Sequence, residues 1–153
     1  MKLADEQATL RAGRALAAAV GAAGGVIALE GELGAGKTTL VRGLLAGLGH
    51  GGRVRSPTYT LMETYELGGR SVFHLDLYRL KSPAEVQPLD LASLLRERDL
   101  LLVEWPERGG DQLPAADLIL RLNYDGGGRA LEAEARSPRG HEWCANLPPP
   151  GGA

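Results

Sequence analysis

The chain has 153 residues, of which 44% are hydrophobic and 24% are charged. This length is typical of one domain, and the composition is too apolar for a disordered chain. With 17 Lys and Arg against 19 Asp and Glu, the formal charge is −2, which excludes a protein that binds nucleic acid through an overall basic surface.

The single cysteine, Cys144, excludes an internal disulfide and a multi-cysteine metal site. The uncharged run over 15–29 follows two arginines, as the core of a signal peptide does, but it is mostly Ala and Gly and acidic residues precede it. It is also shorter than the roughly 20 strongly apolar residues that span a bilayer. We therefore expect a cytoplasmic protein without a membrane segment.

In the first third of the chain, a helix is predicted over Asp5–Val20 with Asp5 as its N-cap. Its apolar stripe is expected to include Leu3, Leu10, Gly13, Leu16, Ala17 and Val20. Three elements follow, namely a short buried strand over Val26–Leu29, a Gly-rich loop over Gly31–Gly36 and a helix over Lys37–Leu48.

Two hairpins and one buried strand are predicted in the rest of the chain. Strand patterns over 58–67 and 71–78 flank Gly68-Gly69, which favours antiparallel pairing. Leu100–Val103 is a run of aliphatic residues typical of a central parallel strand that is covered on both faces. A second hairpin is predicted from 117–122 and 129–136.

Two short helices and a tail complete the predicted elements. Ser82–Glu85 has the form of a capping box, and Asp90 is expected to cap a helix through Leu91, Leu94 and Leu95. Residues 1–147 are expected to form a single domain, and the tail over 148–153, which is rich in Pro and Gly, is expected to be disordered.

The sharpest motif is Gly31-Glu-Leu-Gly-Ala-Gly36-Lys37-Thr38, which matches G-x-x-x-x-G-K-[ST]. Glycines let such a loop aim backbone N–H groups at phosphates, and the following helix adds the positive end of its dipole. Lys37 is expected to reach the β- and γ-phosphates, and the Thr38 hydroxyl to bind Mg²⁺. The residues expected to bind the nucleotide are Leu33, Gly34, Ala35, Gly36, Lys37, Thr38 and Thr39.

A phosphate loop also needs an acid at the end of a neighbouring strand to orient the metal or the attacking water. Glu104 follows Leu100–Val103 directly and is the first candidate, acting on water or on the outer shell of the metal. Asp76 is the second candidate. Strand alternation places His74 on the same face as Asp76, but two ligands do not make a zinc site, so His74 is expected to be a structural or hydrogen-bonding residue.

Thr58 follows a Ser56-Pro57 turn signal between the helix of the phosphate loop and the next strand. A threonine in that place is suited to contact the γ-phosphate and Mg²⁺ as switch segments do. The sequence contains no Asn-Lys-x-Asp stretch, so the guanine-reading element of ordinary GTPases is missing and ATP is the expected nucleotide.

Four segments in this order and spacing resemble the TsaE family, small bacterial ATPases required for making threonylcarbamoyladenosine in tRNA. They are Gly31–Thr39, Ser56-Pro57-Thr58-Tyr59, His74-Leu75-Asp76-Leu77-Tyr78-Arg79 and Glu104-Trp105-Pro106-Glu107. The resemblance covers residues 5–122. It implies a P-loop NTPase fold of the α/β class, a three-layer sandwich with a mainly parallel sheet and antiparallel hairpin additions.

The resemblance also implies an activity. It implies ATP hydrolysis with Mg²⁺ in complex with TsaD and TsaB type proteins, which transfer threonylcarbamoyl to adenosine 37 of tRNA. Hydrolysis then resets or opens the assembly between turnovers, tRNA is contacted only through the complex, and neither DNA nor a membrane is bound. No arginine finger is obvious, although Arg53, Arg55, Arg79 and Arg108 are unplaced, so hydrolysis by the isolated chain is expected to be slow.

Residue roles follow from the same resemblance. Lys37, Thr58 and Glu104 are expected to act in catalysis. Thr38, Asp76 and Glu104 are expected at the metal, and Trp105 resembles a partner-sensitive or structural tryptophan of the family.

Three other functions remain open on the sequence. A small-molecule kinase shares the phosphate loop but needs an acceptor pocket and an Arg-bearing lid, for which 106–113 is short. A nucleotide-dependent switch without catalysis would suit the Thr58 loop. Direct tRNA binding has only Arg53 and Arg55 in its favour.

Overall fold

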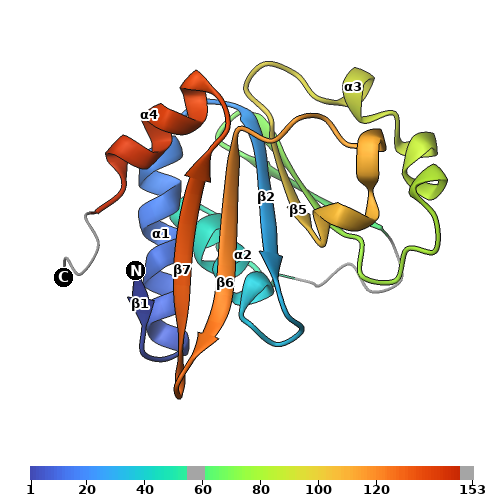
Figure 1. Ribbon diagram of the computed structural model, residues 1–153. Coiled ribbons are helices and arrows are strands. Elements are labelled where there is room, and N and C mark those ends of the chain that lie inside the picture. Colours follow the sequence, from blue (N-terminus) through green and yellow to red (C-terminus); the bar gives the residue numbers. More distant parts are fainter. Residues whose placement is uncertain (55–60, 149–153) are drawn as a thin grey trace.

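One mixed sheet forms the centre of the computed structural model, which describes residues 1–54 and 61–148 (Figure 1). Its strands are β1 (Lys2–Leu3), β2 (Gly25–Gly31), β3 (Met62–Leu67), β4 (Arg70–Asp76), β5 (Leu100–Glu104), β6 (Leu118–Asp125) and β7 (Gly128–Ala135). Their order is β1-β7-β6-β2-β5-β4-β3. The neighbours β6, β2, β5 and β4 run parallel, whereas β1, β7 and β3 pair antiparallel at the edges.

Helices cover both faces of the sheet, so the predicted three-layer α/β fold with hairpin additions is confirmed. The helices are α1 (Glu6–Val20), α2 (Lys37–Gly47), α3 (Leu91–Leu94) and α4 (Pro138–Asn146), with 3₁₀ turns η1 (Pro83–Leu89), η2 (Pro106–Arg108) and η3 (Gly110–Gln112). One core lies between the sheet and α1, α2 and α4, and the other lies under η1 and α3. Within the described residues, no helix has the length and apolar character needed to cross a bilayer.

The central strand β5 shows why the acidic site residues meet α2. All five of its residues are buried, as predicted for a parallel strand covered on both faces. Because side chains alternate along a strand, Leu100 and Leu102 pack in the core on the α2 side, whereas Leu101 and Val103 pack in the other core. The same alternation directs Glu104 toward α2.

Helices α1 and α2 approach closely because glycines line their contact. A Cβ atom on Gly13 would lie 2.4 Å from the Leu40 carbonyl oxygen, and one on Gly43 would lie 2.3 Å from the Leu10 carbonyl oxygen. Only glycine fits at both positions. This contact fixes α2, and with it the loop that precedes α2, against the rest of the fold.

Several predicted elements differ from the structure. Leu3 is buried in β1 and not on the helix that follows, and Leu10 is only half-buried. Asp90 precedes α3 as predicted, but its side chain does not cap that helix. The strand β1 and the helix α4 were not predicted. Of the tail predicted to be disordered, 149–153 lies outside the described residues.

Candidate functional site

The predicted phosphate loop connects β2 to α2 at the carboxyl end of the parallel strands. Gly34 and Gly36 adopt φ values of 79° and 107°, a left-handed region that glycine enters without strain. Gly36 is the N-cap of α2, and no side chain of the described residues caps that helix end. The first N–H groups of α2 are therefore placed to bind an anion.

Lys37 is held beside the loop that precedes it. Its ammonium group donates to the Gly31 carbonyl and, at 3.0 Å, to the Glu32 carbonyl. It also lies 4.2 Å from the centroid of the Trp105 ring. Burial lowers the pKa of Lys37, and the neighbouring carboxylates of Glu104 and Asp76 oppose that effect. Phosphate oxygens are better partners for this cation than two neutral carbonyls.

Glu104 is buried at the end of β5, and its carboxylate contacts Thr38 and His74, two residues that the sequence analysis singled out. The Thr38 hydroxyl donates to its carboxylate at 3.1 and 3.2 Å. Nε2 of His74 lies 2.6 Å from Oε2 of the same carboxylate, so His74 is a hydrogen-bonding residue as predicted. The carboxylate therefore has polar partners on both of the elements that flank it, α2 and β4.

Asp76 lies beside Glu104 because β4 and β5 pair in parallel, with Asp76 opposite Glu104 in register. Its side chain is half-buried and accepts the Tyr78 N–H at 3.1 Å. Burial raises the pKa of Asp76, and the nearby charge of Glu104 raises it further. A cation bound at this edge of the sheet would relieve that repulsion.

A hollow of about 280 Å³ joins these groups. It is lined by Leu33, Gly34, Gly36, Lys37, Thr38, Thr39, Asp76, Tyr78, Glu104 and Trp105. Apart from Thr58, Ala35 is the one predicted site residue that does not line it. The Ala35 side chain is buried in the core, and its N–H donates to the Glu32 carbonyl at 3.0 Å. Thr58 lies outside the described residues.

An aromatic group borders the hollow on one side. Trp105 follows Glu104 with a left-handed φ of 58°, which turns its ring over Lys37. The rings of Tyr78 and Trp105 lie 5.1 Å apart, and the Arg108 guanidinium lies 5.3 and 5.5 Å from them. Of the four arginines left unplaced by the sequence, Arg108 is therefore beside the site, and Arg55 lies outside the described residues.

The β6–β7 hairpin contacts the phosphate loop, which the sequence did not indicate. The Tyr124 hydroxyl donates to the Leu33 carbonyl at 2.8 Å, and Arg129 donates to the Gly34 carbonyl at 3.2 Å. The Arg129 guanidinium also stacks 4.2 Å from the Tyr124 ring centroid. These contacts depend on β6 pairing with β2, a long-range arrangement without a local sequence signal.

Comparison with known proteins decides the family. The profile described as "Threonylcarbamoyl adenosine biosynthesis protein TsaE" matches residues 3–131. The chain belongs to the TsaE family. It is 43% identical to "tRNA threonylcarbamoyladenosine biosynthesis protein TsaE" of Haemophilus influenzae over 75% of this chain and 73% of that protein. The protein of the same name in Nostoc is 42% identical over 85% of this chain and 82% of its own length.

A solved structure agrees with this assignment. "Crystal structure of Bacillus subtilus YdiB" superposes on the chain with a TM-score of 0.77 and 28% sequence identity, covering 96% of this chain and 91% of that chain. The TsaE family takes part in threonylcarbamoyladenosine biosynthesis, so a place in tRNA modification is shown for the chain at this level.

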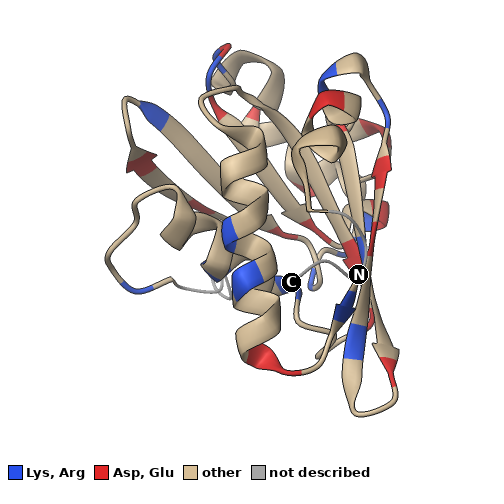
Figure 2. Cartoon of the chain, turned by 90° about the vertical axis from the view of Figure 1, so that its left-hand side faces the viewer, with Lys and Arg blue, Asp and Glu red and all other residues tan. Residues whose placement is uncertain are grey.

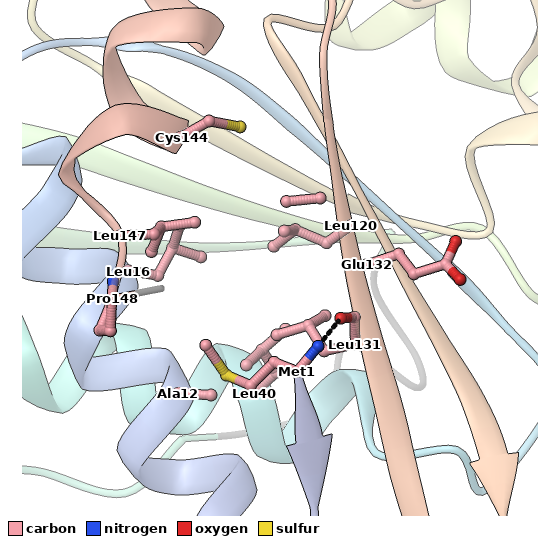
Figure 3. Close-up of a pocket in the computed structure, with 11 residues that line it drawn as sticks. Met1, Ala12, Leu16, Leu40, Leu120, Leu131, Glu132, Cys144, Leu147 and Pro148 are labelled. Carbon is pink, nitrogen blue, oxygen red and sulfur yellow. Dashed lines mark hydrogen bonds between the residues drawn. The ribbon is translucent and has the colours of Figure 1, made fainter. Parts of the chain in front are cut away.

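Elsewhere this TsaE-family chain has an apolar cavity of about 480 Å³ between α1, α4 and the sheet (Figure 3). Leu16, Leu40, Leu120 and Leu131 line it, and the Glu132 carboxylate points away from them. At its edge the terminal amine of Met1 donates to the Leu131 carbonyl at 2.9 Å. Among the described residues that line the cavity, the Met1 amine is the only cationic group, and it is already bonded to Leu131, so the phosphate-loop hollow is the candidate site.

Proposed function

We propose that the chain is a Mg²⁺-dependent ATPase that acts with TsaD and TsaB type proteins in the threonylcarbamoylation of tRNA adenosine 37. One observation carries the proposal. The Thr38 hydroxyl and the carboxylates of Glu104 and Asp76 converge beside the phosphate loop, in one hollow of about 280 Å³. This combination of an anion-binding loop with oxygen ligands is what Mg²⁺–triphosphate hydrolysis requires.

The triphosphate is assigned to Lys37 and to the N–H groups at the start of α2. A second hollow of about 260 Å³ flanks the same loop, and Gly34, Gly36 and Thr39 line both hollows. Thr9 and Arg129 also line the second hollow. We assign the ribose and base of ATP to this second hollow, because it continues from the phosphate site past Thr39.

The oxygen ligands near the loop fit Mg²⁺. Thr38 and Asp76 would hold it, since Mg²⁺ prefers one or two protein oxygens and completes its shell with phosphates and water. Within the described residues, no group of three or more His, Cys, Asp and Glu is placed to hold a metal ion by itself. When bound, Mg²⁺ neutralises charge on the phosphate oxygens.

Glu104 is assigned to the attacking water. Its carboxylate is buried, with 2% of the residue exposed, and it borders the hollow beside Lys37. A carboxylate in that place accepts a hydrogen bond from water and orients the water oxygen toward the terminal phosphorus. Because Thr38 also touches Glu104, the same carboxylate connects the metal ligand to the water.

Partner proteins are proposed to complete the site and to bring the tRNA. Among the described residues, Lys and Arg are interspersed with Asp and Glu over the helices and strands instead of forming one basic stripe (Figure 2). A net charge of −2 gives little attraction to a phosphate backbone. Contact with tRNA is therefore assigned to the complex with TsaD and TsaB type proteins, and hydrolysis to resetting that complex.

Phosphate release tests the proposal. The chain is assayed with ATP and with GTP, with Mg²⁺ or EDTA, alone and with the TsaD–TsaB pair. We expect slow Mg²⁺-dependent release from ATP that the pair accelerates, and loss of release in Lys37→Ala with the fold retained. Equal rates with and without the pair would reject completion by partners. Binding without release would favour a switch, and release only with an added acceptor would favour a kinase.

A further inference from the structure

His74 is a fully buried histidine with a single polar contact among the described residues. Its side chain is 0% exposed, and its Nε2 lies 2.6 Å from Oε2 of Glu104. Within residues 1–54 and 61–148, Nδ1 has no hydrogen-bond partner. Burial of a polar ring costs free energy unless its hydrogen bonds are made. The hydrogen bond to Glu104 is therefore the contact through which this ring can influence the site.

The position of His74 in the sheet explains this contact. Asp76 at the end of β4 is opposite Glu104, and His74, two residues earlier, is opposite Leu102. Both strands direct these alternate side chains toward α2. The ring therefore lies one layer below the Asp76 carboxylate, deeper in the protein, and meets Glu104 from the side away from the hollow.

We propose that His74 is a positioning residue for Glu104. The ring donates its Nε2 proton to Oε2 of the carboxylate and fixes the rotation of the Glu104 side chain. The Thr38 hydroxyl contacts the same carboxylate from α2. Held from two elements, the carboxylate presents a fixed oxygen to the water that it orients. This inference rests on the proposed ATPase function.

The role assigned to His74 differs from that of a ligand or a general base. No bond is formed or broken at the ring, and its proton stays on Nε2 throughout. The ring does not line the hollow, so it reaches neither phosphate nor metal.

Kinetics of two His74 variants test the proposal in the presence of the partner pair. His74→Leu keeps the buried volume but removes the donor, and kcat is expected to fall by about 10- to 100-fold. The Kd for ATP, which depends on the phosphate loop, is expected to change by less than about threefold. His74→Gln, whose Nε2 amide reaches the same place, is expected to recover most of the rate.

A double-mutant comparison with Glu104 distinguishes a positioning role of His74 from a purely structural one. In a Glu104→Gln background, His74→Leu is expected to cause no further loss of kcat, because the group that it positions has already been changed. His141→Gln, at an exposed histidine on α4, is the matched control and is expected to behave as wild type. A loss of kcat and ATP affinity together, no rescue by glutamine, or additive losses would overturn the proposal.

A spectroscopic experiment does not depend on hydrolysis. The chain has 3 histidines, so a ¹H–¹⁵N NMR spectrum of a histidine-labelled sample shows few ring signals. The signals that disappear in His141→Gln and in His50→Gln belong to those two residues, which assigns the remaining ring to His74. We expect a protected, downfield proton on Nε2 of His74 that moves upfield in Glu104→Gln. A proton on Nδ1 instead, or a signal unchanged by Glu104→Gln, would overturn the proposal.

These two experiments distinguish the proposal from the proposed function. If the wild-type chain releases no phosphate even with its partners, the ATPase function fails. The NMR result then still decides whether His74 positions Glu104. If hydrolysis is observed but the NMR proton or the glutamine rescue is absent, the ATPase function stands and the positioning role fails.

Discussion

The Thr38 hydroxyl donates to Glu104, lying 3.2 Å from Oε1 and 3.1 Å from Oε2. The two residues are 66 positions apart in the chain, and they meet because α2 starts where β5 ends. With its hydrogen directed at Glu104, the Thr38 oxygen has its lone pairs left for a cation in the hollow. In the proposed ATPase, this contact would orient Thr38 for Mg²⁺ before any nucleotide is bound.

Removal of this hydroxyl is expected to remove the Mg²⁺ dependence of ATP binding. In Thr38→Val the ATP Kd measured with Mg²⁺ should rise by about tenfold or more, since ligand and outer-shell changes cost metal sites 10- to 100-fold. Without Mg²⁺ the variant and the wild type should bind ATP alike. Thr38→Ser, which keeps the oxygen, is the control. Calorimetric titration measures both values, and a Mg²⁺ effect of normal size in Thr38→Val would contradict the assignment.

Asp76 is expected to lower stability at neutral pH in the absence of metal. Burial, with Glu104 nearby, raises its pKa, so the folded protein binds its proton more tightly than the unfolded chain does. The free energy of unfolding then falls as pH rises from the unfolded pKa through the folded pKa. Asp76→Asn should therefore raise Tm at pH 7 by roughly 1–3 °C, with less gain near pH 4.

The same variant should lose Mg²⁺-dependent ATP binding, so stability and binding change in opposite directions. Thermal melts without nucleotide at several pH values provide the measurement. Asp125→Asn, at an exposed end of β6, should leave Tm unchanged. A decrease of Tm at pH 7 in Asp76→Asn would show that the carboxylate stabilises the fold.

Trp105 is expected to report nucleotide binding by its fluorescence. The chain has 2 tryptophans. The Trp105 ring lies 4.2 Å from the Lys37 ammonium, whereas Trp143 is buried in the core on α4. The phosphates of ATP are expected to draw the Lys37 ammonium away from the ring. ATP should therefore change the emission of wild type and of Trp143→Phe, but not of Trp105→Phe. A response that survives in Trp105→Phe and is lost in Trp143→Phe would contradict the geometry.

The local parts of the site could be predicted from the sequence, because each depends on short-range spacing. The phosphate loop needs only the order of glycines, Lys37 and Thr38, and Glu104 follows from its place after a buried aliphatic run. Alternation gave the face of His74 and Asp76. It could not give the contact of His74 with Glu104, which depends on β4 pairing with β5 in one particular register.

The missed elements are those with weak or non-local signals. Strand β1 has two residues and exists only because β7 pairs with it. Helix α4 has a Ser137 N-cap and a Pro at its start, so the sequence does contain a signal for the beginning of this helix. Trp143 is the only large buried side chain of α4, however, so no apolar stripe indicates that the helix continues. The contacts of Tyr124 and Arg129 with the phosphate loop depend on the order of strands.

The glycine contact between α1 and α2 is expected to be essential for stability. In Gly43→Ala the added methyl would overlap the Leu10 carbonyl, and the helices would have to separate. Overpacking of this kind costs about 1–3 kcal/mol. Denaturant unfolding gives the free energy. Gly51→Ala, where a Cβ atom meets nothing within 4 Å, is the control, and equal stability of the two variants would show that α1 and α2 can move apart freely.

The β6–β7 hairpin is expected to support ATP binding through Tyr124. Its hydroxyl donates to the Leu33 carbonyl at 2.8 Å. Tyr124→Phe removes this hydrogen bond to the phosphate loop but keeps the ring that stacks on Arg129. Loss of one such hydrogen bond should weaken ATP binding by about 2- to 10-fold, with Tm nearly unchanged because the ring is half exposed, at 49%. Asn123→Ala, the exposed neighbour on β6, serves as the control in the same titration. An ATP Kd unaffected by Tyr124→Phe would mean that β2 and α2 alone fix the loop.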